Sequence, residues 1–161
     1  MNTKKRPRPK TGDARTAPPS WVPSFRLSDQ FRREIDATLY AGVPLIIVAG
    51  NRQGAGGVAL WTAALRAEIG DGGRASVLPV ADLGGVPRAV RGLVRRLLPR
   101  DPAHWCALDW DGQVGGPVRG DHGPLVAAAY GADGSLRLWE VLPFDVADPA
   151  MRDRLIESTA F

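Results

Sequence analysis

The stretch LIIVAGNRQGAGGVALW, residues 45–61, contains the glycine-rich segment that is the strongest candidate for a binding or catalytic loop. An apolar run ends in a loop with glycines at positions 50, 54, 56 and 57, and the periodicity that follows predicts a helix. Backbone N–H groups point out of the first turn of a helix, so such a loop can hold an anion or activate a side chain. We therefore expect residues 50–57 to form the candidate functional loop.

A dinucleotide site is one interpretation of these glycines, because Gly50, Gly54 and Gly56 have the Gly-x-x-x-Gly-x-Gly spacing of short-chain dehydrogenases. That family also uses a Tyr with a Lys four residues later, and this sequence has no lysine after Lys10. A P-loop needs Lys and Ser or Thr at the positions where Gly56 and Gly57 stand. An NAD(P)-binding, short-chain-dehydrogenase-like fragment is therefore the weakest of the alternatives.

Hydrophobic periodicity predicts an α/β domain: a hairpin, strands that alternate with helices, a second hairpin around residues 131–134, and a last helix with Asp148 as its N-cap. Because helices separate the early strands, we expect a mixed central sheet with a parallel core, an antiparallel C-terminal hairpin and helices on both faces. The expected strands are residues 43–50, 75–83, 105–110, 125–130 and 135–141, and the expected helices are 58–69, 86–100 and 148–161.

Three further segments carry a resemblance to a known family. Pro23-Ser24-Phe25-Arg26-Leu27-Ser28-Asp29 opens the domain, and ALDWDGQVGG precedes GPLVAAAYGADGSLRLWE at its end. In this order and spacing they resemble the redoxins, the peroxiredoxin and alkyl-hydroperoxide-reductase branch of the thioredoxin fold, over about residues 21–161. The resemblance implies a thioredoxin-like domain.

The resemblance also implies a redox cysteine at the start of the first helix, where the helix dipole lowers the pKa of a thiol. That position falls in Gln53-Gly54-Ala55-Gly56, directly after Arg52, and contains no sulfur. The family further has a cis-proline that faces this loop, and Pro124 is the candidate. We therefore predict a redox-inactive module, not an enzyme, that binds a protein or peptide in the degenerate groove beside Pro124 and needs no cofactor.

Cys106 is the only cysteine, which excludes an intrachain disulfide. It lies in the segment HWCALDW, predicted as a strand, where a lone cysteine is usually a buried residue with an unreactive thiol. The alternative function is a thiol-dependent antioxidant or oxidoreductase activity that uses Cys106 or a thiol of a partner. His104, Cys106, Asp109 and His122 do not have the spacing of a standard metal site, so we expect no metal.

Positive charge is concentrated in residues 1–20, with six basic residues and one acidic residue, in a chain of formal net charge +4. We expect this Pro-rich tail to be disordered and to contact nucleic acid weakly, with residues 21–161 forming the domain. No apolar run is long enough to span a membrane and no secretory signal is recognisable, so the expected location is cytoplasmic. The sequence does not predict an oligomeric state.

The predicted helix at 86–100 is the second basic feature. Its apolar residues should point inward and its arginines outward, toward solvent or an anionic partner, because no acidic residue lies four positions away to pair with them. The expected inward residues are Val90, Leu93, Val94 and Leu97, and the expected outward residues are Arg88, Arg91, Arg95 and Arg100.

Overall fold

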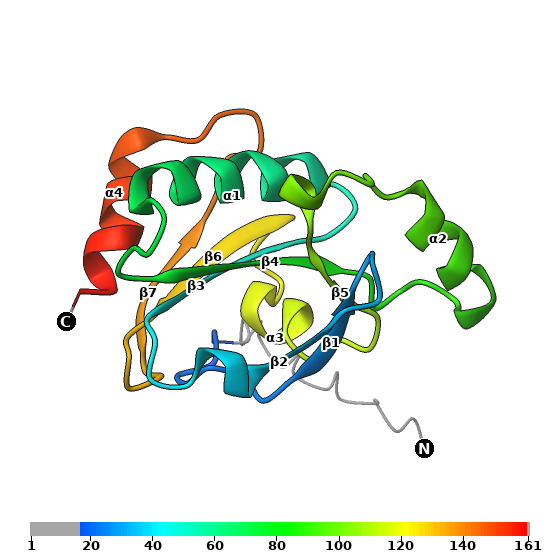
Figure 1. The fold of residues 1–161 in the computed structure, drawn as a ribbon, viewed down its shortest axis with the longest axis horizontal. Helices are drawn as coiled ribbons and strands as arrows, with labels where there is room; N and C mark the ends of the chain where they lie inside the picture. Colours follow the sequence, from blue (N-terminus) through cyan, green and yellow to red (C-terminus); the bar gives the residue numbers. More distant parts are fainter. Residues whose placement is uncertain (1–16, 161) are drawn as a thin grey trace, which may run out of the picture.

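β3 (Leu45–Gly50) lies at the centre of the protein, and all six of its residues are buried. The strand is continuously apolar because it is covered on both faces. It pairs in parallel with β4 (Ser76–Asp82) and antiparallel with β6 (Leu125–Tyr130). The computed structural model describes residues 17–160, and Figure 1 shows these strands between layers of helices.

Seven strands form one mixed sheet in the order β2-β1-β5-β4-β3-β6-β7. β5 (Ala107–Asp109) continues the parallel pairing of β3 and β4, which confirms the predicted parallel core. β1 (Arg26–Asp29) pairs antiparallel with β2 (Glu34–Asp36), and β6 pairs antiparallel with β7 (Leu136–Val141). Both predicted hairpins, and with them the fold class, are confirmed.

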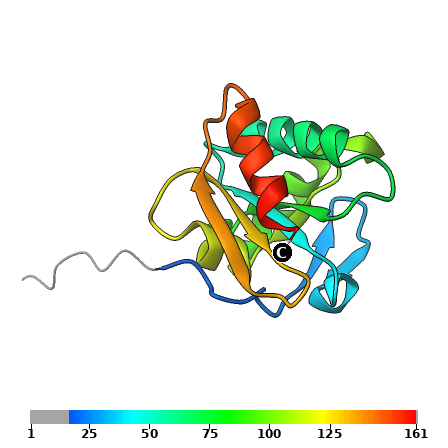
Figure 2. The same cartoon turned by 90° about the vertical axis from the view of Figure 1, so that its left-hand side faces the viewer.

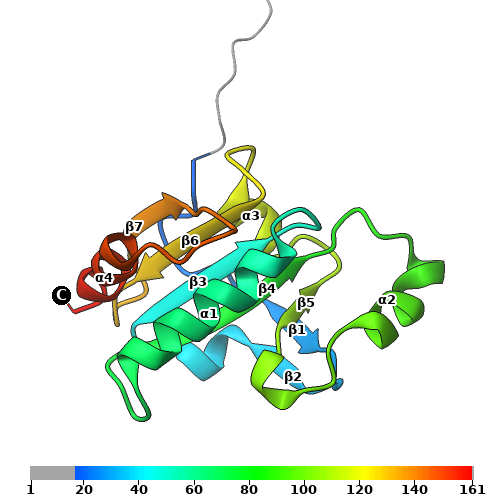
Figure 3. The same ribbon diagram turned by 90° about the horizontal axis from the view of Figure 1, so that it is seen from above.

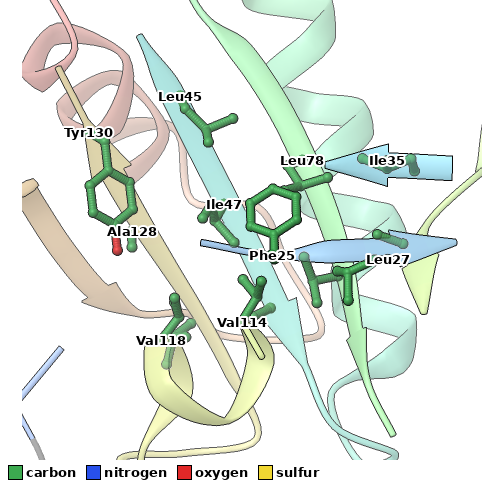
Figure 4. Packing of buried hydrophobic residues seen from close by; sticks show 14 residues of the cluster. Phe25, Leu27, Ile35, Leu45, Ile47, Leu78, Val114, Val118, Ala128 and Tyr130 are labelled. Atoms are coloured by element: carbon green, nitrogen blue, oxygen red, sulfur yellow. The ribbon is translucent and has the colours of Figure 1, made fainter. Parts of the chain in front are cut away.

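Helices cover both faces of the sheet, as Figure 2 shows from one end. α1 (Ala55–Ile69) and α4 (Pro149–Ser158) share one apolar cluster, in which Trp61 is fully buried and donates its indole N–H to the Pro143 carbonyl at 2.6 Å. α3 (Gly115–Arg119) and a 3-10 helix (Ala37–Tyr40) lie on the opposite face. Figure 4 shows the second cluster, where Val114 and Val118 pack toward Ile47.

The N-terminal end of the described chain is tied to the sheet. Trp21 forms a bridge with Ser135 at the outer edge of β7, and the Leu136 N–H donates to the Ser20 carbonyl at 2.8 Å. Asp148 accepts the Met151 N–H at 2.8 Å, which confirms the predicted N-cap of α4. The tail expected to be disordered comprises residues 1–20. Of these, residues 1–16 lie outside the described part of the chain. Within residues 17–160, no helix has the length and apolar character to cross a membrane.

α3 was not expected, because its sequence GGPVR contains residues that are typical of turns. The helix forms where the buried carboxylate of Asp109 meets its first turn. One oxygen accepts the N–H of Gln113 at 2.9 Å, and the other accepts those of Val114 and Gly115 at 2.8 and 2.6 Å. A carboxylate in this place satisfies N–H groups that have no partner within the helix and complements the helix dipole.

The predicted orientation of the helix at 86–100 is confirmed only in part. Arg88 and Arg100 are exposed as expected and Val94 is half-buried, but the other assignments are wrong. A 3-10 turn (Arg88–Val90) leads into a short α2 (Arg91–Leu97), which lies beyond β5 in Figures 1 and 3. Leu93 and Leu97 are 59% and 76% exposed, and Val90 is 41% exposed. Arg91 and Arg95 instead point at the body of the protein. The hydrogen bonds that these guanidinium groups donate there, and not apolar packing, fix the orientation of α2.

Thr62 gives a test of the packing between α1 and the sheet. Its hydroxyl is buried and is the only such side-chain oxygen without a hydrogen-bond partner in residues 17–160. Thr62→Val keeps the shape of the side chain and removes the unsatisfied hydroxyl, so the free energy of unfolding should rise by about 1 kcal/mol. Thr62→Ala is the control and should be less stable than Thr62→Val, because it also removes a buried methyl group. Denaturant unfolding measures both, and equal stability of the two variants would contradict the packing.

Candidate functional site

The candidate loop joins β3 to α1 at the carboxyl end of the parallel strands. Asn51 shapes it: its side-chain oxygen accepts the N–H groups of Gln53 at 2.9 Å and Gly54 at 3.2 Å. The Asn51 N–H donates to the Pro124 carbonyl at 3.0 Å, which ties the loop to the start of β6. The loop is therefore held both by its own side chain and by a segment distant in sequence.

The glycines of the loop allow close packing. A Cβ atom at Gly54 would overlap the Pro124 carbonyl oxygen, and one at Gly57 would overlap the side chain of Leu125 and lie 2.8 Å from the Cβ atom of Phe144. At Gly56, in contrast, nothing lies within 4 Å of a Cβ atom. Gly54 and Gly57 thus let α1 approach the chain around Pro124, while Gly56 faces open space.

The positions expected for a redox cysteine lie where the resemblance places them, at the start of α1. Arg52, Gln53, Ala55 and Gly56 are exposed there, and Gly54, the N-cap of α1, is buried. The N-cap supplies no side-chain hydrogen bond to the helix. The loop therefore offers an exposed backbone surface with one cation, Arg52, and no nucleophile.

Pro124 faces this loop, but the predicted cis bond is wrong. No peptide bond in the described chain is cis. In this trans arrangement the carbonyls on either side of the bond already have partners, because Arg119 donates to the Gly123 carbonyl at 3.0 Å and Asn51 donates to that of Pro124. Each of these two carbonyls therefore has one lone pair already engaged by a protein donor.

Sequence reasoning missed a buried ion pair beside the loop. Asp82, the last residue of β4, contacts Arg119 of α3 at 3.1 Å, and both side chains are largely buried. The pair links the end of β4 to the segment that leads to Pro124, since Arg119 also holds Gly123. An aspartate that closes each of two apolar strands, Asp82 and Asp109, is the signal that could have indicated polar anchors at this edge of the sheet.

No known family model and no curated protein matches the sequence. Solved structures do match. The putative thiol:disulfide interchange protein DsbE from Chlorobium tepidum has 19% sequence identity and a TM-score of 0.60, over 86% of this chain and 92% of that one. The pneumococcal exposed lipoprotein thioredoxin Etrx1 from Streptococcus pneumoniae has 17% identity and a TM-score of 0.60, over 83% and 98%. The mitochondrial 2-cys peroxiredoxin from Plasmodium falciparum has 9% identity and a TM-score of 0.56, over 88% and 93%.

This chain has a thioredoxin-like fold. The resemblance to redoxins is thereby confirmed for the architecture, on a sequence that lacks the redox cysteines. The dehydrogenase alternative does not fit this fold, since the strand before a dinucleotide-binding loop lies in a parallel sheet, whereas β6 runs antiparallel beside β3. Packing against Pro124 accounts for the glycine at position 54 without a bound pyrophosphate.

Cys106 lies away from the start of α1, where the resemblance places the redox cysteine. It directly precedes β5, and β4 separates that strand from β3 and its loop. Burial, together with the nearby charge of Asp29, raises the pKa of the Cys106 thiol to about 11. Its N–H donates to the side-chain oxygen of Gln30 at 3.0 Å. A half-buried thiol that stays protonated at neutral pH is a poor nucleophile.

The other predicted site residues do not gather at the loop. No group of three or more potential metal ligands occurs in residues 17–160. His104 pairs with Asp101 at 3.1 Å, and the ring of His122 meets that of Trp139 edge-on at 4.6 Å. Of the four predicted arginines, Arg91, Arg95 and Arg100 line one cavity of about 490 Å³ next to α2, and Arg88 lies outside it.

Gly54 and Gly56 form a matched pair that tests the packing of the loop. Gly54→Ala should lower the free energy of unfolding by about 2–3 kcal/mol, because the added methyl group meets a main-chain carbonyl that cannot move away easily. Gly56→Ala should leave stability unchanged or raise it by up to about 1 kcal/mol, because the methyl group enters open space on a helix. Thermal or denaturant unfolding measures the stability of both variants. Similar effects of the two substitutions would show that the loop does not press against Pro124.

Proposed function

We propose that this protein is a redox-inactive thioredoxin-fold module that binds a segment of a partner protein at the start of α1. The observation that carries the proposal is that the start of α1 has a fixed, exposed backbone but contains no sulfur that would make it reactive. A site that keeps its shape without its nucleophile can bind but cannot exchange disulfides.

The surface around the loop has the character of a docking site. Arg52 and Gln53 supply polar contacts, and Phe144, packed against Gly57, is 54% exposed beside them. Val141, which lies 3.1 Å from the place of a Cβ atom at Gly123, is 41% exposed. Apolar side chains next to a rigid polar loop favour a protein partner, because both burial and directed hydrogen bonds are available to it.

The thiol-dependent alternative has less support. The raised pKa of Cys106 leaves almost no thiolate at neutral pH, and the residue lies on the far side of β4 from the loop. Any exchange chemistry would therefore have to use a thiol that the partner supplies.

A disulfide-reduction assay tests the loss of redox activity. We expect the wild-type protein and Cys106→Ser to be equally inactive toward insulin disulfides and peroxides. The double variant Gln53→Cys/Gly56→Cys restores a Cys-x-x-Cys pair at a helix start, where the dipole lowers the pKa of a thiol, and should gain measurable disulfide exchange. This variant is the positive control for the shape of the site. Activity of the wild type that is lost in Cys106→Ser would contradict the proposal.

Site-specific crosslinking tests the binding surface. A photoreactive residue placed at position 53 should give a discrete crosslinked partner in cells that make this protein. The same residue at exposed Asp71, beyond the other end of α1, is the matched control and should not. The product at position 53 should be lost in Phe144→Glu, because a charge would then replace the exposed ring. Equal products from positions 53 and 71 would argue against a docking site at the loop.

A further inference from the structure

The cavity beside α2 is the second feature that calls for a function, and it lies at the opposite end of the sheet from β7. Its volume is about 490 Å³, within the range of small-molecule sites. Its walls come from α2 and the residues after it on one side and from the β1–β2 turn on the other. The side chains that give it its chemistry are Arg32, Arg91, Arg95, Arg96, Arg100 and Trp110.

The charge of this cavity is hardly compensated. Asp111 pairs with Arg91 at 3.3 Å. Within residues 17–160, no acidic group forms an ion pair with the other four arginines of the cavity. Guanidinium groups that converge without acidic partners repel one another, so an anionic ligand would relieve that repulsion.

Two of these arginines, and the turn that carries Arg32, are held in place before any ligand arrives. Arg91 donates to the Trp110 carbonyl at 3.1 Å and stacks on its ring at 5.4 Å. Arg95 donates to the Ser28 hydroxyl at 2.9 Å. Gln30, which is buried, donates to the His104 carbonyl at 2.9 Å and so fixes the β1–β2 turn against the chain that follows α2. Groups that are already ordered lose less entropy on binding.

Arg32 adopts a left-handed backbone conformation, which is unfavourable for a residue with a side chain. Its φ is +66°, and it is the only residue other than glycine with positive φ in the described chain. Asp29 stabilises this turn by accepting the N–H groups of Phe31 and Arg33 at 2.8 Å each. Glycine would adopt the same conformation without strain. Residues other than glycine in this conformation occur most often at functional sites, which supports a role for the Arg32 side chain.

The orientation of α2 also places arginines at the cavity at the expense of apolar packing. Its arginines face the cavity while Leu93 and Leu97 face solvent, the reverse of the arrangement that burial of apolar surface favours. From these observations we infer that the cavity between α2 and the β1–β2 turn binds a small anion that carries two or more linked phosphate groups. Guanidinium groups bind phosphate oxygens in pairs, and arginines on both walls suit an anion longer than a single phosphate.

Calorimetric titration of the full chain with sodium tripolyphosphate at low ionic strength tests the inference. The wild type should bind saturably, and Arg96→Gln/Arg100→Gln should weaken binding at least about ten-fold, since it removes two charged hydrogen-bond donors. Arg88→Gln, on the same segment but outside the cavity, is the matched control and should bind as the wild type does. Every variant contains residues 1–16 with their basic side chains. If these side chains bound the tripolyphosphate, the double variant would have the affinity of the wild type, and the inference would be overturned.

Arg32→Gly separates binding from folding. The substitution removes the guanidinium group and relieves the strain, so affinity for tripolyphosphate should fall while the melting temperature rises. Unchanged affinity in this variant would overturn a site with two arginine walls.

The probe chemistry identifies the ligand class. Orthophosphate should bind more weakly than tripolyphosphate, and equal affinity would overturn the requirement for linked phosphates. Adenosine triphosphate that binds as tightly as tripolyphosphate assigns recognition to the phosphates alone, whereas tighter binding assigns a nucleotide, and both outcomes support the site. A single-stranded oligonucleotide that binds more tightly than either, with the same dependence on Arg96 and Arg100, would overturn the assignment to a small ligand.

Discussion

The contact between the loop after β3 and the chain around Pro124 is the constraint on which the candidate site depends. One hydrogen bond, from the Asn51 N–H to the Pro124 carbonyl, and one position without a side chain, Gly54, bring the start of α1 against the start of β6. These two segments are far apart in the sequence and come together only because β6 pairs with β3. The sheet therefore positions the loop, and the loop in turn determines which residues at the helix start are exposed.

Most of the architecture could be predicted because it depends on local patterns. Continuous apolar runs indicated β3 and β6, and the Asp148-Pro149 pair indicated the start of α4. The order of strands and helices was sufficient to predict a mixed sheet with a parallel core. Features that depend on tertiary contacts were not accessible. α3 depends on the buried carboxylate of Asp109 in β5, which accepts hydrogen bonds from N–H groups at the start of the helix. The five residues of α3 alone do not predict this interaction.

The place of the candidate loop, between an apolar strand and a helix, could be predicted from the sequence, but its contacts could not. The spacing of the glycines indicated a tight loop. It could not show that Gly54 packs against the carbonyl of Pro124, whereas a side chain at Gly56 would enter open space. The orientation of α2 was inaccessible for a similar reason. Periodicity gives the two faces of a helix, and burial of the apolar face is the usual outcome. Here hydrogen bonds from Arg91 and Arg95 to the body of the protein reverse that outcome.

The chain segment around Trp21 has a consequence for self-association. It occupies the outer edge of β7 near Ser135, so part of the main chain there already has its hydrogen-bond partners. At the other end of the sheet, β2 is only three residues long and carries Glu34 and Asp36. Unpaired strand edges are where sheets from separate molecules join, and short or charged edges resist this. The addition of a strand from a second copy of this protein is therefore disfavoured at β2 and at the start of β7.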